Sequence, residues 1–249
     1  MKEMLPRALL ALPFSLLLSS NTGASETPAA APEVRHAAEL SVRDHKGIIG
    51  YESAFDTNMR GGPLHRSYHY RNAYLYNDER LVKARALYKD DNGHVADAAE
   101  LNAETRKIES EQGSGKVFAV PFDARHFSEY RYEKGICAGC SADEVAFKFT
   151  SLVQDEFHGN GSMTLDGRGH VMNLTYVPSV LPPHASKARV TIYRGAVLPD
   201  YWATVKSEGH YEGRYGFVRG SADMQSRNEH FHRFSSVDAA VAALNSGKL

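Results

Sequence analysis

The sequence predicts a mainly β protein: an antiparallel curved sheet, half-barrel or barrel, with one or two helices. Three observations carry this prediction. Apolar and polar residues alternate with period two in several separate runs, as in strands that bury one face. Short turn signals join successive runs, and strands joined in this way pair antiparallel. With 42% hydrophobic residues the chain can bury a sizeable core, and a sheet of about ten strands tends to curl or close.

The run from residue 48 to residue 88 predicts the first strands. Gly61, Gly62 and Pro63 form a strong turn signal after the first strand. The second strand, SYHYRNAYLY, leads through a short polar turn at Asn77 and Asp78 into a third alternating run. The tyrosines of the second strand share one face: Tyr68, Tyr70, Tyr74 and Tyr76. We therefore expect a hairpin with a tyrosine-rich face.

Two segments predict helices. Residues 95–111 are rich in Ala, Glu and Lys and lack β-branched density, which favours a mostly exposed helix. Near the C-terminus, residues 237–244 place Ala and Leu side chains at helical spacing, and Ser235 or Ser236 can cap this helix.

The strand pattern returns between these helices. In EVAFKFTSLV, residues 144–153, Phe147 and Phe149 share one face with Val145. The clearest hairpin spans residues 157–177 and turns at Gly167-Arg168-Gly169. Its second arm carries a more apolar face, formed by Met172, Leu174 and Tyr176. Further strands are expected up to a last one at residues 230–234.

The N-terminus has the order of a secretory signal peptide. Lys2 and Arg7 are followed by a largely apolar run and then by small residues, with Ala24 or Ser25 as cleavage points. The apolar run is about half the ~20 residues that a membrane-spanning helix needs, and an uncleaved anchor is the alternative. We expect a signal peptide at 1–25, a disordered linker at 26–40 and a single β-rich domain at 41–249, exported to the periplasm or the extracellular space.

Charge narrows the range of partners. The formal net charge is -1, whereas a nucleic-acid-binding domain is expected to show a basic patch and a high pI. The sequence also has no polybasic stretch of the kind that holds proteins on anionic membranes. We therefore expect no nucleic-acid partner and at most a transient association with a membrane.

Cys137 and Cys140 are the two cysteines of the chain and are spaced as C-x-x-C. In an exported protein they meet oxidising conditions. A redox pair of this spacing usually opens a helix, but here Ser141-Ala142-Asp143 and a predicted strand follow. A metal site usually needs a second pair of soft ligands. A structural disulfide is therefore favoured over a redox or a metal-binding role.

The tightest histidine spacing is His230-x-His232, which on a regular strand would point both rings to one face. A metal site needs at least three converging ligands, and the sequence pattern supplies no third ligand for this pair. Surface or hydrogen-bonded histidines are therefore the favoured interpretation. No metal and no other cofactor is expected.

Asp155, Glu156 and His158 resemble an acid–base cluster. Neighbouring residues of a strand point to opposite faces, so a solvated strand end is the favoured interpretation and no catalytic residue is assigned. An extracytoplasmic hydrolase that uses these three residues remains an alternative function. It requires their side chains to converge in one cleft.

The hairpin GSMTLDGRGHVMNLTYVP, together with the export signal and the succession of strands interrupted by a helix, resembles the LolA/LolB-like superfamily of periplasmic lipoprotein carriers and receptors. The resemblance covers about residues 40–234 in pattern. It implies a curved half-barrel, lidded by helices, that holds acyl chains and has no catalytic residues. The family pattern also includes a long amphipathic helix after the signal peptide, and residues 33–46 depart from it.

The resemblance leads to an expected function: non-enzymatic binding of an apolar or amphipathic ligand, such as a lipid or a lipoprotein acyl chain. The expected lining residues are equally good core residues: Tyr68, Tyr70, Phe147, Phe149, Leu174 and Tyr176. Besides the hydrolase, an envelope scaffold or interaction module is an alternative, and it predicts a large exposed apolar patch without an enclosed cavity.

Overall fold

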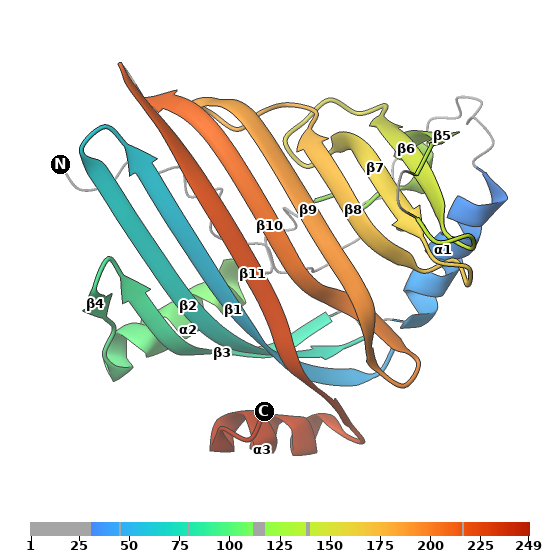
Figure 1. Ribbon diagram of the computed structural model, residues 1–249. Helices are drawn as coiled ribbons and strands as arrows, with labels where there is room; N and C mark the ends of the chain where they lie inside the picture. The colour runs from blue at the N-terminus through green and yellow to red at the C-terminus, as the bar shows by residue number, and fades with distance from the viewer. Residues whose placement is uncertain (1–30, 45, 79, 112–117, 138–139, 216) are drawn as a thin grey trace.

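The computed structural model describes residues 31–44, 46–78, 80–111, 118–137, 140–215 and 217–249. Its strands form one antiparallel sheet of 11 strands in the order β4-β3-β2-β1-β11-β10-β9-β8-β7-β6-β5 (Figure 1). The strands are β1 Ile48–Gly61, β2 Leu64–Asn77, β3 Arg80–Asp91, β4 His94–Val95, β5 Tyr130–Lys134, β6 Val145–Ser151, β7 Gly159–Leu165, β8 Val171–Pro178, β9 Ala185–Leu198, β10 Tyr201–Tyr215 and β11 Val218–Phe234.

The order of the strands follows from their hairpins, with one exception. Strands β1 to β4 form one run of neighbours and strands β5 to β11 form another. The pairing of β1 with β11 joins the two runs, from Ile48 opposite Phe234 to Gly61 opposite Gly220. Strands β4 and β5 remain as the two edges, so the described strands do not close into a barrel. The predicted fold class, a curved antiparallel sheet or half-barrel, is confirmed.

The pairing register aligns side chains of the same face across the sheet. We call the inner face the one that carries Phe149, Tyr176 and Tyr68, and the opposite face the outer face. One row of the inner face runs through Phe149, Gly161, Tyr176, Val190, Gly209, Met224, Thr57 and Tyr68. The neighbouring row runs through Phe147, Met163, Leu174, Ile192, Ser207, Ser226, Phe55 and Tyr70.

The main core lies on the inner face of β5 to β9. Helix α1, Pro32–Asp44, contributes Val34 and Ala37 to it. The segment that precedes β5 contributes Phe118, Val120 and Phe122. These side chains pack against inner-face residues such as Phe147 and Leu174, which are 1% and 0% exposed. The core is therefore built from the sheet, one helix and one irregular segment.

Helices pack on both faces of the part of the sheet formed by β1 to β3. Helix α2, Ala98–Glu111, packs Ile108 against the inner-face tyrosines Tyr74 and Tyr76. Helix α3, Val237–Ser246, lies on the outer face, where Arg85 donates to the backbone oxygen of Leu244. Figure 1 shows α2 beside the β2–β4 end of the sheet and α1 beside the β5–β8 end.

The helix termini carry capping residues that local sequence rules recognise. At the start of α2, Asp97 accepts from the backbone N–H of Ala99 and Glu100, while Glu100 accepts from the N–H of Asp97. This reciprocal pair is a capping box. Ser236 caps α3 by accepting from the N–H of Ala239, and Gly247 ends it in the left-handed region at φ 67°. Both predicted helices are thus present, with α2 beginning three residues later than expected.

Helix α1 corrects one expectation. The sequence placed residues 26–40 in a disordered linker, but residues 32–40 belong to α1. Val34, Ala37 and Leu40 are buried. The apolar stripe that they form is short, and it contains one small and one β-branched residue, so the sequence signal for an amphipathic helix is weak. This helix is stabilised more by tertiary packing than by the intrinsic helix propensity of its residues. The described residues therefore contain three α-helices instead of one or two; residues 1–30, with the expected signal peptide, lie outside the described ranges.

The backbone of β8 lies very close to Gly161 of β7. A Cβ atom at Gly161 would clash with the Thr175 carbonyl oxygen and would lie 2.8 Å from the Tyr176 Cα and 2.9 Å from the Phe149 ring. The absence of a side chain thus allows this close approach of β8 and of the Phe149 ring. No helix in the described residues is both long and apolar enough to cross a membrane.

We expect Gly161→Ala to lower the free energy of unfolding by about 3 kcal/mol, because the new methyl group overpacks a closed part of the core. The matched control is Gly195→Ala in β9, where an added Cβ meets Val205 at an ordinary 3.7 Å. This control should stay within about 1 kcal/mol of the parent. Urea denaturation followed by circular dichroism measures both, and equal effects would contradict the close approach at Gly161.

Leu40→Ala tests whether α1 is docked. Leu40 is 7% exposed, and its Cδ1 faces Gly169 in the turn between β7 and β8. Its truncation should cost about 2–5 kcal/mol. Val42, on the same helix, is 50% exposed, so Val42→Ala should change stability by less than about 0.5 kcal/mol. Denaturant midpoints of the two variants compare them directly, and a disordered segment would give two small effects.

Candidate functional site

The inner face of β10 and β11 is lined by small side chains. Ser207 and Gly209 on β10 are half-buried, and so is Ser226 on β11. Together with Met224 these residues form what we call the inner-face floor. The hydroxyl groups of Ser207 and Ser226 lie 2.6 Å apart and hydrogen-bond each other. Each of the two hydroxyl groups thus has a hydrogen-bond partner, and neither depends on a ligand or water for one.

The floor separates two groups of larger apolar side chains. On one side, Val190 and Ile192 of β9 continue the main core. On the other side stand Phe55 and the tyrosines of β2. Neighbouring strands are about 4.8 Å apart, so the distance across the floor from β9 to β1 is about 14 Å. This width exceeds the thickness of a single hydrocarbon chain.

The wall on β1 and β2 is aromatic with polar tips. The Tyr70 ring lies 6.4 Å from that of Phe55 and 6.4 Å from that of Tyr68, onto which it stacks. The Lys89 ammonium group stands 5.5 Å from the centre of the Tyr70 ring. Burial raises the pKa of Tyr70, with further contributions from Glu104 and Asp91, so its hydroxyl stays protonated. Tyr68 and Tyr70, both expected lining residues, lie on this wall.

The other four expected lining residues lie in the main core. Phe147, Phe149 and Leu174 are at most 2% exposed, and Tyr176 is 5% exposed. The Phe118 ring stacks on Tyr176 at 3.8 Å between centroids. Burial raises the pKa of Tyr176 well above its ordinary value. The structure therefore brings all six expected residues onto one face, but side chains of the protein itself already pack against these four.

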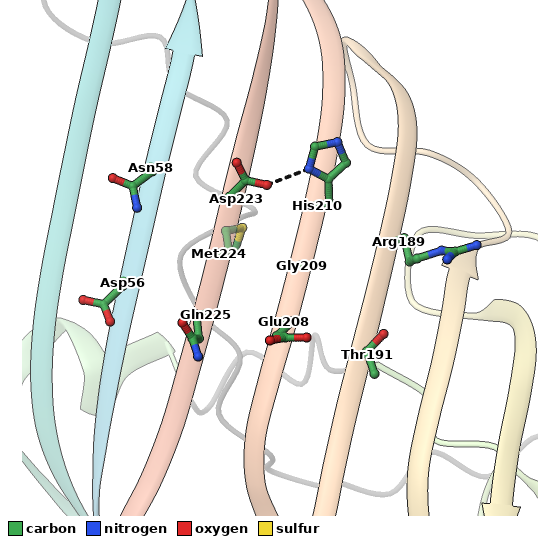
Figure 2. A pocket seen from close by; sticks show the side chains of 10 residues that line it. All are labelled: Asp56, Asn58, Arg189, Thr191, Glu208, Gly209, His210, Asp223, Met224 and Gln225. Atoms are coloured by element: carbon green, nitrogen blue, oxygen red, sulfur yellow. Dashed lines mark hydrogen bonds and ion pairs between the residues drawn. The ribbon is translucent and has the colours of Figure 1, made fainter. Parts of the chain in front are cut away.

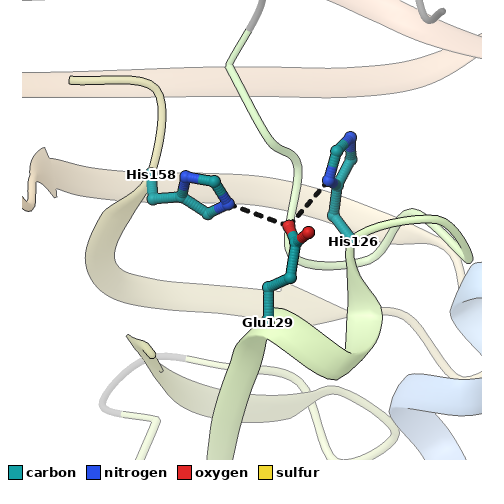
Figure 3. Close-up of side chains that lie close together, drawn as sticks. All are labelled: His126, Glu129 and His158. Atoms are coloured by element: carbon teal, nitrogen blue, oxygen red, sulfur yellow. Dashed lines mark hydrogen bonds and ion pairs between the residues drawn. The ribbon is translucent and has the colours of Figure 1, made fainter. Parts of the chain in front are cut away.

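A second site candidate is a chain of titratable side chains just before the first residues of β5 and β7. His158 contacts Asp155 through Nδ1 and Glu129 through Nε2, both at 2.8 Å. His126 contacts the same Glu129 Oε2 through Nδ1 at 2.7 Å (Figure 3). The ligand atoms of His126, Glu129 and His158 all lie within 4.8 Å of one another. We call these three residues the His–Glu–His cluster.

Asp155 is held in place from several directions. Its Oδ1 accepts from the backbone N–H of Phe157 and of His158 and contacts the His158 ring. Burial alone acts to raise the pKa of this carboxyl group, but these hydrogen bonds outweigh it and lower the pKa. Asp155 is therefore a fixed, ionised partner for one nitrogen of His158.

The structure revises the acid–base cluster that the sequence suggested. Asp155 and His158 do converge, although both were expected at a solvated strand end, because they belong to a turn before β7. Glu156 is exposed. Glu129 and His126 take its place beside His158, and the sequence pattern pointed to neither. The signal that could have found them is their own spacing of three residues, combined with a tight turn before β5.

The two histidines with the tightest spacing are not assembled into such a cluster in the described structure. His230 and His232 are both exposed, and His230 Nδ1 lies 3.5 Å from Glu52. His230 has a positive φ of 54°, beside a register shift between β1 and β11. The regular alternation that would align the two rings is interrupted there. The favoured interpretation of surface histidines agrees with this placement.

The outer face carries a shallow polar pocket of about 360 Å³ over β1, β11, β10 and β9 (Figure 2). Its charged side chains largely pair within the protein. His210 Nδ1 and Asp223 Oδ1 are 2.6 Å apart, and the hydrogen bond that Asp223 accepts raises the pKa of His210. Asp56 contacts His69 at 2.6 Å, and Glu208 contacts Lys206 at 2.6 Å. This pairing leaves the pocket a weaker binding candidate than the inner face.

Cys137 and Cys140 form a disulfide in the turn between β5 and β6. The two cysteines are thus bonded to each other, as the sequence led us to expect. The disulfide closes a very short loop, so its effect on the entropy of the unfolded chain is small.

No family model matches the chain, and no curated protein matches it. Among solved structures, it is similar to a LolA superfamily protein from Nitrosomonas europaea, with 8% identity and a TM-score of 0.36 over 85% of this chain and 97% of that chain. A putative outer membrane lipoprotein-sorting protein domain from Vibrio parahaemolyticus gives 11% identity and a TM-score of 0.42 over 86% and 96%. A DUF1329 family protein from Desulfovibrio piger gives 12% and 0.39 over 85% and 97%.

The first of these names is that of the group that the sequence pattern resembles. A likeness at this level of identity and TM-score concerns the overall architecture alone. It transfers no ligand and no residue role from those proteins to this chain.

Proposed function

We propose that this protein is a non-enzymatic carrier that binds an apolar or amphipathic ligand, a lipid or the acyl chain of a lipoprotein, on the inner face of its sheet. The observation that carries the proposal is the inner-face floor. Ser207, Gly209 and Ser226 are small residues between two apolar groups of side chains, and the Tyr211 ring lies beside Gly209. A hydrocarbon chain laid along this floor would contact apolar groups on both sides.

The energetic basis is removal of hydrocarbon from water. Each buried CH₂ group contributes about 0.8 kcal/mol, so a long acyl chain supplies enough free energy to offset the loss of its own freedom. Tyr68 and Tyr70, which stack on the wall beside the floor, each carry a hydroxyl group. An amphipathic ligand could place its polar end there while its chain lies on the floor.

Export is part of the proposal. The order of basic, apolar and small residues at the N-terminus supports it. The Cys137–Cys140 disulfide also supports it, because disulfides persist in oxidising compartments and are rare in the cytosol. A lipid carrier in the periplasm or outside the cell would meet its ligand at a membrane surface only transiently.

Filling the floor should block binding. In Ser226→Phe, a ring replaces a hydroxymethyl group between Ser207 and Phe55, and the affinity for a fluorescent long-chain fatty acid should fall by about tenfold or more. The matched control is Gln225→Phe, one residue away but on the outer face with Asp56 and Glu208. It should bind the probe like the parent protein. Fluorescence titration of the delipidated proteins measures both affinities.

Native mass spectrometry of the protein purified from the host envelope without harsh detergent provides an independent test. A defined mass excess that delipidation removes is expected, and Ser226→Phe should lose it while Gln225→Phe keeps it. A parent protein that carries no lipid and does not bind the fatty acid would overturn the proposal. Equal loss of binding in both variants would place the ligand somewhere other than the inner-face floor.

A further inference from the structure

The His–Glu–His cluster lies apart from the inner-face floor, and two short segments build it. His126 immediately precedes a 3₁₀ turn, Phe127–Glu129. The backbone N–H of Glu129 donates to the carbonyl oxygen of His126. In 3₁₀ geometry there are three residues per turn, so side chains three positions apart eclipse one another. His126 and Glu129 are therefore directed to the same side by the backbone itself.

The second segment delivers His158 in a fixed orientation. Its side chain is 10% exposed, and its Nδ1 is held by Asp155, which two backbone N–H groups hold in turn. The turn itself is anchored because Ser179 Oγ accepts from the N–H of Asp155 and donates to its carbonyl. This leaves Nε2 directed at Glu129 from a distance of 2.8 Å. One ring nitrogen is thus oriented by a carboxylate while the other faces the cluster.

That arrangement is typical of metal-binding histidines. A ligating imidazole almost always donates its second ring N–H to a carboxylate, a backbone carbonyl or water, which fixes the tautomer and the ring plane. Here the donor set is two imidazole nitrogens and one carboxylate, with Asp155 as the outer carboxylate. Glu129 and Asp155 together bring two negative charges beside two imidazoles, so a divalent cation would balance the charge of the cluster.

We propose that His126, Glu129 and His158 form a binding site for a divalent transition-metal ion of the zinc class. Imidazole and carboxylate ligands in a two-to-one ratio suit Zn²⁺ and its neighbours, whereas Mg²⁺ and Ca²⁺ prefer sites made of oxygen. Three protein ligands leave a fourth position of a tetrahedron for water. Asp155 is a positioning residue, because it acts on the ion through His158.

The contacts of Glu129 with the two histidines must open slightly for an ion to enter. Zinc–ligand distances of 2.0–2.1 Å place tetrahedral ligand atoms about 3.3 Å apart. Glu129 Oε2 lies 2.7 Å from His126 Nδ1 and 2.8 Å from His158 Nε2, so each pair opens by about half an ångström. The His126 side chain is 29% exposed, which leaves the ring free to turn and the site open to solvent.

Metal binding would have a structural consequence. Glu129 and His126 end the segment that carries Phe118 and Phe122 across the main core, and His158 precedes β7. An ion would therefore fasten this segment to the sheet at the point where β5 begins. The site serves stability of the fold and is independent of whether the inner face holds a lipid.

The test is Zn²⁺ binding to the purified, untagged, metal-free protein by isothermal titration calorimetry and by competition with a chromophoric chelator. We expect one Zn²⁺ per chain and a melting temperature that rises by about 5–10 °C at a hundredfold excess over Kd. His126→Gln should abolish this binding. Asp155→Asn, which leaves the ligands in place, should weaken it about 10- to 100-fold. Co²⁺ in place of Zn²⁺ should give the visible spectrum of a tetrahedral site.

The control is His210→Gln, because His210 also contacts two carboxylates, Asp223 and Glu212, but on the exposed outer face. This variant should bind Zn²⁺ like the parent. His126→Gln should melt like the parent in the absence of metal, which separates loss of a ligand from loss of the fold. No stoichiometric Zn²⁺ in the parent, or stoichiometric binding unchanged in His126→Gln, would overturn the proposal.

Discussion

The pairing of β1 with β11 is the contact on which the rest of the sheet depends. It joins strands that are far apart in the sequence, and after a register shift between Gly50 and Glu52 it holds the two hairpin arrays in one register from Glu52 to Gly61. Because side chains alternate with period two, a slip of one residue here would move every β1 side chain to the opposite face. Gly220 supports the register, since a Cβ there would lie 2.6 Å from the Arg60 carbonyl oxygen. The inner-face floor and the tyrosine wall face each other only in this register.

The segment before β5 contributes both to the main core and to the His–Glu–His cluster. Phe118 and Phe122 close the main core over the inner face, and Arg194 stacks its guanidinium group 4.8 Å above the Phe122 ring. A few residues later the same segment supplies His126 and Glu129. The same stretch of chain therefore both covers the core and carries two residues of the cluster. An ion bound at the cluster would thus act on the same segment that covers the core.

The parts of the structure that could be predicted from the sequence are those that local pattern decides. The alternation in β2 and β6 gave the correct faces for Tyr68 and Phe149, because side-chain direction in a strand depends on the strand alone. The cap at Ser236 was likewise predictable from neighbouring residues. Helix α1 could not be predicted in this way, because its apolar stripe is short. The helix depends on the packing of Val34 in the main core with residues of β6 to β8. Nor could the cluster be predicted, because His158 and Glu129 are 29 residues apart and meet through the fold.

The edge of β3 has a consequence for the protein at high concentration. Strand β4 pairs only with Asp90 and Asp91, so most of the β3 edge that faces away from β2 has no partner strand among the described residues. Side chains of α2 fill that role: Glu109 accepts from the N–H of Ala84, and Thr105 accepts from the N–H of Ala86. A second molecule that approached this edge would find two of its N–H donors already engaged. Helix α2 therefore acts as a guard against edge-to-edge aggregation, and a chain that lost it would expose a template for intermolecular β pairing.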